Sequence, residues 1–161
     1  MMKKYIILSI WLSSYTLAEN QFYVGADIGR LSFDQKEFDS VGVSSFLLGY
    51  QFVNWSVDGS YNISKTDSDV FGGDQKIKMY HLYSTYRNKG NYYYKLKVGI
   101  TNERYKLYDE SGKLIFDDVH SGITRGLGVG YNIGSLSMAL EYSWLGGSLE
   151  MFSGGIRYNF E

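Results

Sequence analysis

The final stretch of the chain, residues 149–160, alternates apolar and polar side chains with a period of two residues. Successive side chains of an extended strand point to opposite faces, so this alternation predicts a two-faced β-strand. One face carries Phe152, Gly154, Ile156, Tyr158 and Phe160, and the other carries Met151, Ser153, Gly155, Arg157 and Asn159. The apolar face suits either a protein core or lipid, and this strand alone leaves both open.

The same alternation recurs in seven earlier segments, which gives eight predicted strands in all. In one of them, residues 77–87, aromatic side chains fall on both faces; we assign Tyr80 and Leu82 to the apolar face and His81 to the other. The seven segments are 21–30, 43–53, 55–63, 77–87, 92–101, 122–133 and 135–145.

The predicted connections alternate in length along the chain. Long polar segments at 31–42, 64–76 and 102–121 alternate with tight turns around 53–54, 88–91 and 134–135, and the last connection, 146–148, is short. Antiparallel strands joined in this way place the long loops at one end and the tight turns at the other. This is the up-and-down arrangement of a membrane-spanning barrel.

Aromatic residues near the strand ends favour a lipid-facing barrel over a secreted barrel that binds an apolar ligand. They match the two aromatic girdles of a transmembrane barrel, while the few, nearly balanced charges on the other face suit a closed lumen better than a wet exterior. We therefore predict an all-β fold, an eight-stranded antiparallel up-and-down transmembrane β-barrel. The girdle residues are Trp55, Tyr61, Tyr86, Tyr92, Tyr131, Trp144, Tyr158 and Phe160.

The first eighteen residues have the composition of a signal peptide. Lys3 and Lys4 precede an apolar run, and residues 16–18 form a small-residue cleavage site, so we expect a signal peptide at 1–18 and a barrel domain at 19–161. The chain has no cysteine, which excludes disulfides and thiolate chemistry. A net charge of -1 provides no basic surface for nucleic acid, and we expect no nucleic-acid partner.

Several segments resemble the small outer-membrane β-barrel proteins of Gram-negative bacteria, the OmpA-type, OmpX-type and opacity-like porin superfamily. The resemblance covers the whole chain after the signal peptide, and it is specific for fold and compartment but not for activity. The matching segments are 22–29 (FYVGADIG), 48–61 (LGYQFVNWSVDGSY), 94–99 (YKLKVG), 126–131 (GLGVGY) and 155–160 (GIRYNF).

The resemblance implies a place in the outer membrane and a set of partners. These are outer-membrane lipid and lipopolysaccharide, the barrel assembly machinery and a host or surface ligand, with the barrel itself a monomer. The chain end resembles the assembly signal of this superfamily at Ser153, Gly155, Tyr158 and Phe160, although Glu161 follows the usual terminal aromatic. The implied function is a structural or adhesion-type surface protein.

Six charged residues fall on the face assigned to the lumen: Asp27, Asp58, Lys95, Lys97, Glu141 and Arg157. Closure brings the first and last strands together, which would place Arg157 between Asp27 and Glu141. Because buried charges persist only when paired, we predict a network that closes the lumen. A narrow channel for small solutes is the alternative.

No catalytic or cofactor-binding arrangement stands out. His81 and His120 are the only histidines, and no serine–histidine–acid spacing accompanies them, so we expect no enzyme and no cofactor; a lipid-modifying barrel is a remote alternative. Asp67, Asp69 and Asp74 lack the ordered spacing of a calcium loop.

The longest predicted loop, residues 102–119, contains a hairpin pattern. Tyr105, Leu107, Leu114 and Phe116 lie on either side of residues 109–112 (DESG), which have turn chemistry. We expect the fifth and sixth strands to continue beyond the membrane as a protruding hairpin whose unpaired edge binds a partner strand. A solvated loop without a partner is the alternative.

Overall fold

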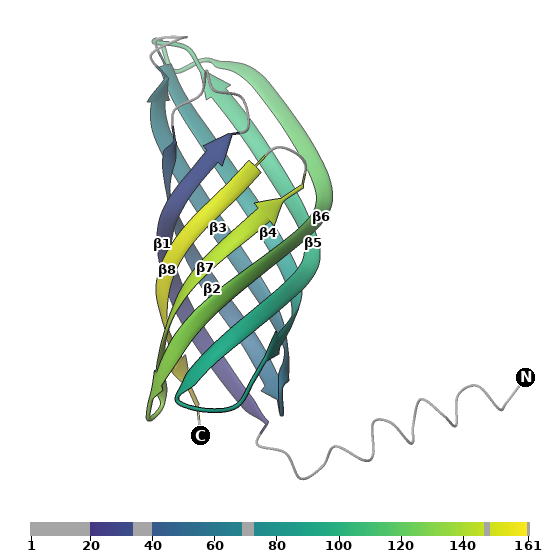
Figure 1. Ribbon diagram of the computed structural model, residues 1–161. Helices are drawn as coiled ribbons and strands as arrows, with labels where there is room; N and C mark the ends of the chain where they lie inside the picture. Colours follow the sequence, from purple (N-terminus) through teal and green to yellow (C-terminus); the bar gives the residue numbers. More distant parts are fainter. Residues whose placement is uncertain (1–19, 34–39, 69–72, 147–148, 161) are drawn as a thin grey trace, which may run out of the picture.

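The eight strands form a closed barrel in a computed structural model of the chain (Figure 1). The structure describes residues 20–33, 40–68, 73–146 and 149–160; the predicted signal peptide and Glu161 lie outside them. The strands are β1 (Gln21–Phe33), β2 (Val41–Phe52), β3 (Trp55–Ser68), β4 (Gly73–Arg87), β5 (Tyr92–Tyr108), β6 (Leu114–Ile133), β7 (Leu136–Leu145) and β8 (Leu149–Asn159).

Each strand pairs antiparallel with its neighbours in sequence, and β1 pairs with β8 to close the barrel. The seam between β1 and β8 runs from Tyr23 opposite Asn159 to Phe33 opposite Leu149. The predicted fold, an eight-stranded antiparallel up-and-down transmembrane barrel, is confirmed. No helix among the described residues is long and apolar enough to cross a membrane.

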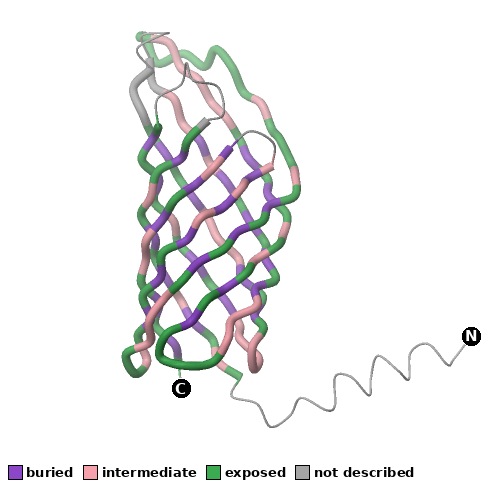
Figure 2. The backbone as a smooth tube through the Cα atoms, viewed as in Figure 1, coloured by how far each residue is buried: buried purple, intermediate pink, exposed green. Residues whose placement is uncertain are grey.

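Side chains alternate between the outer surface and the interior where the strands form the barrel wall, so that buried and exposed residues follow one another there in Figure 2, whereas β6 is exposed along most of its protruding part. On β4, where aromatic side chains fall on both faces, Leu82 is 52% exposed on the outside while Met79 is fully buried inside, as the sequence pattern predicted. Outward apolar side chains surround the whole barrel, and Ile28 on β1 is 74% exposed. The apolar side chains thus form a belt on the outer surface, whereas in a soluble protein most apolar side chains face the core.

The long connections are shorter than the sequence predicted. Most of residues 64–76 are strand, because Ser64 to Ser68 pair with Gly73 to Ile77, and β1 likewise continues to Phe33. The sequence rule ends a strand where the apolar face ends, whereas a ladder of backbone hydrogen bonds continues for as long as a neighbouring strand is present. Residues 34–39, 69–72 and 147–148 lie outside the described part of the chain.

The barrel wall is taller on one side. Strands β3 to β6 contain 14, 15, 17 and 20 residues, whereas β7 and β8 contain 10 and 11. The longer strands rise at the end opposite the tight turns, above the ends of β7 and β8 (Figure 1). The upper segments of the longer strands therefore extend beyond the ends of β7 and β8.

Candidate functional site

A cluster of charged side chains fills the interior towards the tight-turn end. Glu141 on β7 is its centre: Lys95 and Arg157 both contact its Oε1 atom, and the Lys97 Nζ atom lies 2.8 Å from Oε2. All of these side chains are at most 8% exposed. One carboxylate on β7 therefore holds two cations from β5 and one from β8, and this links three strands of the wall through the interior.

Asp27 on β1 joins the cluster through Arg157, whose Nη2 atom lies 3.9 Å from Asp27 Oδ2. Arg157 thus lies between the two acids, at the seam where the barrel closes. Gly155 lies opposite Asp27 and leaves space for this carboxylate, since a Cβ atom at Gly155 would clash with Asp27 Oδ1. A larger residue at Gly155 would displace Asp27 from the cluster.

Asp58 does not share this cluster, contrary to the prediction of one six-residue network. The Tyr23 hydroxyl donates to Asp58, and the Thr85 hydroxyl donates to its other oxygen at 2.6 Å. Among the described residues no ion pair joins Asp58 to a base. The sequence indicates how far along its strand a residue lies but not which side chains approach it across the barrel. Asp58 on β3 is approached by hydroxyl groups from β1 and β4.

A layer of apolar side chains fills the interior above the charged cluster, towards the end with the longer strands. Sequence reasoning missed this layer, because several of its members lie in segments assigned to loops or at strand ends. The same period of two, continued past the apolar belt, would have placed them inside. The layer consists of Leu31, Val43, Ile77, Met79, Leu145, Leu149 and Met151, with Tyr105 packed against it.

The two histidines differ in burial and in their contacts. His81 is buried in the lumen, where its Nε2 atom lies 2.9 Å from Asn62 Nδ2 and its ring stacks on Tyr83. His120 is exposed on the hairpin and its Nε2 atom lies 2.9 Å from Asp118. The described residues contain no group of three metal-binding side chains; Asp69 lies outside them, as do the side chains of Asp67 and Asp74.

The protruding hairpin is formed by the ends of β5 and β6. Leu107 lies opposite Phe116 and Tyr108 opposite Leu114, with a register shift between Leu107 and Tyr108. β5 is also paired with β4 as far as Leu107, whereas β6 pairs with β7 only from Arg125 onwards. Within the described chain, residues 114–121 of β6 therefore have a neighbouring strand on one side only.

The four predicted hairpin residues differ in accessibility. Leu114 is 44% and Phe116 is 52% exposed, and Leu107 is partly buried. Tyr105 is directed into the barrel instead, where it packs against the apolar layer and its hydroxyl donates to Glu103 at 2.7 Å. Tyr105 thus anchors the hairpin to the lumen, and the exposed apolar surface belongs to β6.

The hairpin turn depends on Asp109. Its Oδ1 atom accepts a hydrogen bond from the Ser111 hydroxyl at 2.6 Å and from the backbone amide of Lys113 at 2.8 Å. The Ser111 hydroxyl, with help from the Lys113 amide, lowers the pKa of Asp109. Gly112 has a positive φ of 78°, a backbone conformation that favours glycine.

We expect Asp109→Ala to loosen this turn while the barrel stays folded. The exchange rate of the Lys113 amide proton should rise several-fold, because the amide loses its carboxylate acceptor. Because the pKa of Asp109 is depressed in the fold, its contribution is present above the ordinary carboxyl pKa of about 4 and is lost as the pH falls through the lower folded value. Glu110→Ala is the control, and equal exchange in both variants would contradict the assignment.

No protein-family model and no curated protein matches the sequence. Solved structures do match the fold. The attachment invasion locus protein Ail of Yersinia pestis, in complex with the heparin analogue sucrose octasulfate, is 17% identical; the match covers 89% of this chain and 99% of Ail with a TM-score of 0.62. Neisserial surface protein A is 15% identical over 88% of this chain and 97% of its own, with a TM-score of 0.64.

The N-terminal β-barrel domain of OprF from Pseudomonas aeruginosa is 13% identical, and the match covers 88% of this chain and all of that domain with a TM-score of 0.59. The chain has the fold of the small outer-membrane β-barrels. The resemblance noted in the sequence is therefore confirmed at the level of the fold. At these identities the likeness extends to the architecture and not to a ligand.

The residues that we predicted to form an assembly signal lie at the end of β8, the last strand of the barrel. Ser153 and Gly155 on β8 face the interior, while Tyr158 and Phe160 face outwards with ring centroids 5.1 Å apart. Phe160 extends the strand, because its amide donates to the carbonyl of Phe22 at 2.8 Å. Ser153 and Gly155 thus lie on one face of the strand end, and Tyr158 and Phe160 on the other.

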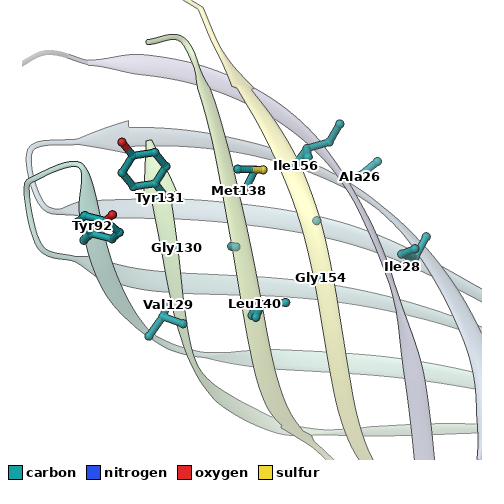
Figure 3. Close-up of a pocket in the computed structure, with 12 residues that line it drawn as sticks. Ala26, Ile28, Tyr92, Val129, Gly130, Tyr131, Met138, Leu140, Gly154 and Ile156 are labelled. Carbon is teal, nitrogen blue, oxygen red and sulfur yellow. The ribbon is translucent and has the colours of Figure 1, made fainter. Parts of the chain in front are cut away.

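The outer wall of the barrel is hollowed at the small residues of β8 and β1. Met138, Leu140 and Ile156 surround Gly154, with Ile28 on the neighbouring strand (Figure 3). The hollow has a volume of about 720 Å³ and a largely apolar lining, in which Tyr92 and Tyr131 carry the side-chain hydroxyls. We regard it as part of the lipid-facing wall of the barrel.

Proposed function

We propose that the chain is an outer-membrane protein of a Gram-negative bacterium that acts at the cell surface through its longer strands. The observation that carries this proposal is the single-sided pairing of residues 114–121 on β6. In this arrangement the tight turns face the periplasm and the hairpin faces outwards. Export requires the signal peptide at 1–18, and insertion requires the assembly machinery, which would read Ser153, Gly155, Tyr158 and Phe160.

The barrel itself has a structural role in this proposal. The charged cluster around Glu141 and the apolar layer above it occupy the interior one after the other, so a solute would have to displace both. An eight-stranded barrel is only wide enough for side chains to fill it. This supports a closed lumen over the narrow channel, and we assign no catalytic step, cofactor or nucleic-acid partner to the chain.

The free edge of β6 suits a partner that supplies an extended peptide segment. Unpaired backbone groups on an edge strand accept a further strand through main-chain hydrogen bonds, and alternate side chains give the contact its specificity. Leu114, Phe116 and Val119 are all at least 44% exposed along this edge. Ail was solved in complex with a heparin analogue, so a sulfated sugar is the alternative ligand for a surface barrel with this fold.

Replacement of residues 107–116 by a short Gly-Ser turn tests the proposal. Tyr105 is retained, because its side chain anchors the wall to the apolar layer. We expect the variant to fold and to show an unchanged heat-dependent shift in gel mobility. Adhesion of intact cells displaying it to cultured epithelial cells should fall to the level of cells without the protein.

The matched control is Glu110→Ala at the tip, which leaves both strands and the hydrogen bonds of Asp109 in place. Adhesion that survives the replacement would remove the hairpin from the proposal and direct attention to the connections within 31–42 and 64–76. Absence of the folded protein from outer-membrane fractions would overturn the proposed location itself.

A further inference from the structure

Five cationic side chains gather on the outer surface of β3, β4 and β5, immediately beyond the apolar belt. Ile63 and Lys78 face each other across β3 and β4, and Lys78 faces Arg104 on β5. One step further along the strands, Lys76 lies between Lys65 and Lys106. We call this surface the basic face, and it comprises Lys65, Lys76, Lys78, Arg104 and Lys106.

Within the described part of the chain, the basic-face cations of β4 and β5 outnumber the carboxylates that contact them. Asp117 on β6 accepts two hydrogen bonds from Arg104, at 2.8 and 2.6 Å, and lies 3.7 Å from Lys106. Lys76 lies over the ring of Tyr108, and no described carboxylate pairs with Lys76 or Lys78. Asp67 and Asp74 follow further along β3 and β4, and their side chains lie outside the described part.

Like charges directly opposite each other on neighbouring strands destabilise a sheet. Lys76 and Lys106 form such a pair, and Lys78 and Arg104 form another. An anion seated between the strands would offset this repulsion. The surface provides a place for one, a hollow of about 130 Å³ lined by Lys76, Lys78, Arg104, Lys106 and Tyr108.

The position of the basic face relative to the apolar belt indicates which class of anion would bind there. On β4 the outward residues pass from Leu82 and Tyr80 to Lys78 within one step of the alternation, and on β5 Ile100 is followed outwards by Asn102 and Arg104. Tyr80 and Tyr61 stand at this boundary with ring centroids 5.0 Å apart, as an aromatic girdle at a lipid headgroup layer would. The cations thus lie level with the headgroups of a surrounding bilayer.

We propose that the basic face binds the phosphorylated sugar headgroup of a lipid in the outer leaflet, with a phosphate in the hollow between β4 and β5. This inference rests on the proposed place in the outer membrane. Arg104 remains oriented by Asp117, while Lys76, Lys78 and Lys106 supply the point charges that lysine offers to phosphate. The lipid chains lie against the apolar belt below.

The test compares purified full-length barrels in detergent micelles. The variant carries Lys76→Gln, Lys78→Gln and Lys106→Gln, and the control carries Lys89→Gln and Lys113→Gln, two lysines away from the basic face. Added lipopolysaccharide should bind the wild type and the control equally, and the triple variant roughly ten- to a hundredfold more weakly. Enzymatically dephosphorylated lipopolysaccharide should bind all three proteins as weakly as the triple variant binds the intact lipid.

Equal binding of intact lipopolysaccharide by the triple variant and the wild type would overturn the proposal. Binding of a soluble sulfated heparin fragment without binding of lipopolysaccharide would also overturn it, because the basic face would then bind a ligand from outside the membrane. Cell fractionation of the same three proteins separates this inference from the proposed function. A barrel that reaches the outer membrane without lipid binding contradicts only the headgroup site.

Discussion

Replacing Glu141 with alanine should lower the free energy of unfolding of the barrel by roughly 3–5 kcal/mol, the cost typical of breaking a buried ion pair. Glu141 contacts Lys95, Lys97 and Arg157, and all three cations are buried. Without this carboxylate they would share only Asp27, which lies 3.9 Å from Arg157. Three buried cations around one remaining acid are a large electrostatic penalty, and we expect a clear fall in the thermal unfolding midpoint.

Glu110→Ala, at the exposed tip of the hairpin, is the matched control and should leave the midpoint unchanged. A second variant keeps the experiment informative if Glu141→Ala fails to fold: adding Lys97→Met removes one of the orphaned cations and should restore part of the stability. Conductance across a planar bilayer is the other measurement. If Glu141→Ala had a higher conductance and an unchanged unfolding midpoint, the interpretation of a closed lumen would be wrong and the narrow channel would be favoured.

Arginine in place of Val98 should destabilise the barrel by roughly 2–4 kcal/mol, the range for a cation at the middle of a bilayer. Val98 is 55% exposed on the outer face of β5, between Leu96 and Ile100, which are exposed in the same way. A guanidinium at this position would have to leave water for lipid hydrocarbon. Folding into lipid vesicles, titrated with urea, measures the difference.

Ser111→Arg at the hairpin tip is the control for this substitution, since it places the same charge in water. Leu140→Arg on β7, which β6 separates from β5, tests a second position of the lipid-facing wall and should behave like Val98→Arg. If all three variants lost the same stability, the orientation of the barrel in the bilayer would be wrong.

The period of two in the sequence determined which side chains face outwards and which face the lumen. This follows because a strand that is apolar on one side has only two orientations, and the choice for one residue sets the choice for all its neighbours. Leu82 and His81 could therefore be placed on opposite sides of the wall from adjacent letters. The order of the strands also followed from the sequence, because alternating long and tight connections allow only neighbouring strands to pair.

The partners of each inward side chain were decided only by the closed barrel. Asp58 and Glu141 have the same charge and both face the lumen, yet one accepts hydrogen bonds from hydroxyl groups and the other binds three cations. Their surroundings depend on the stagger between strands and on the angle around the axis, and neither is encoded within a single strand. The apolar layer around Met79 and Leu145, and the free edge of β6, likewise arise where strands of unequal length meet in space.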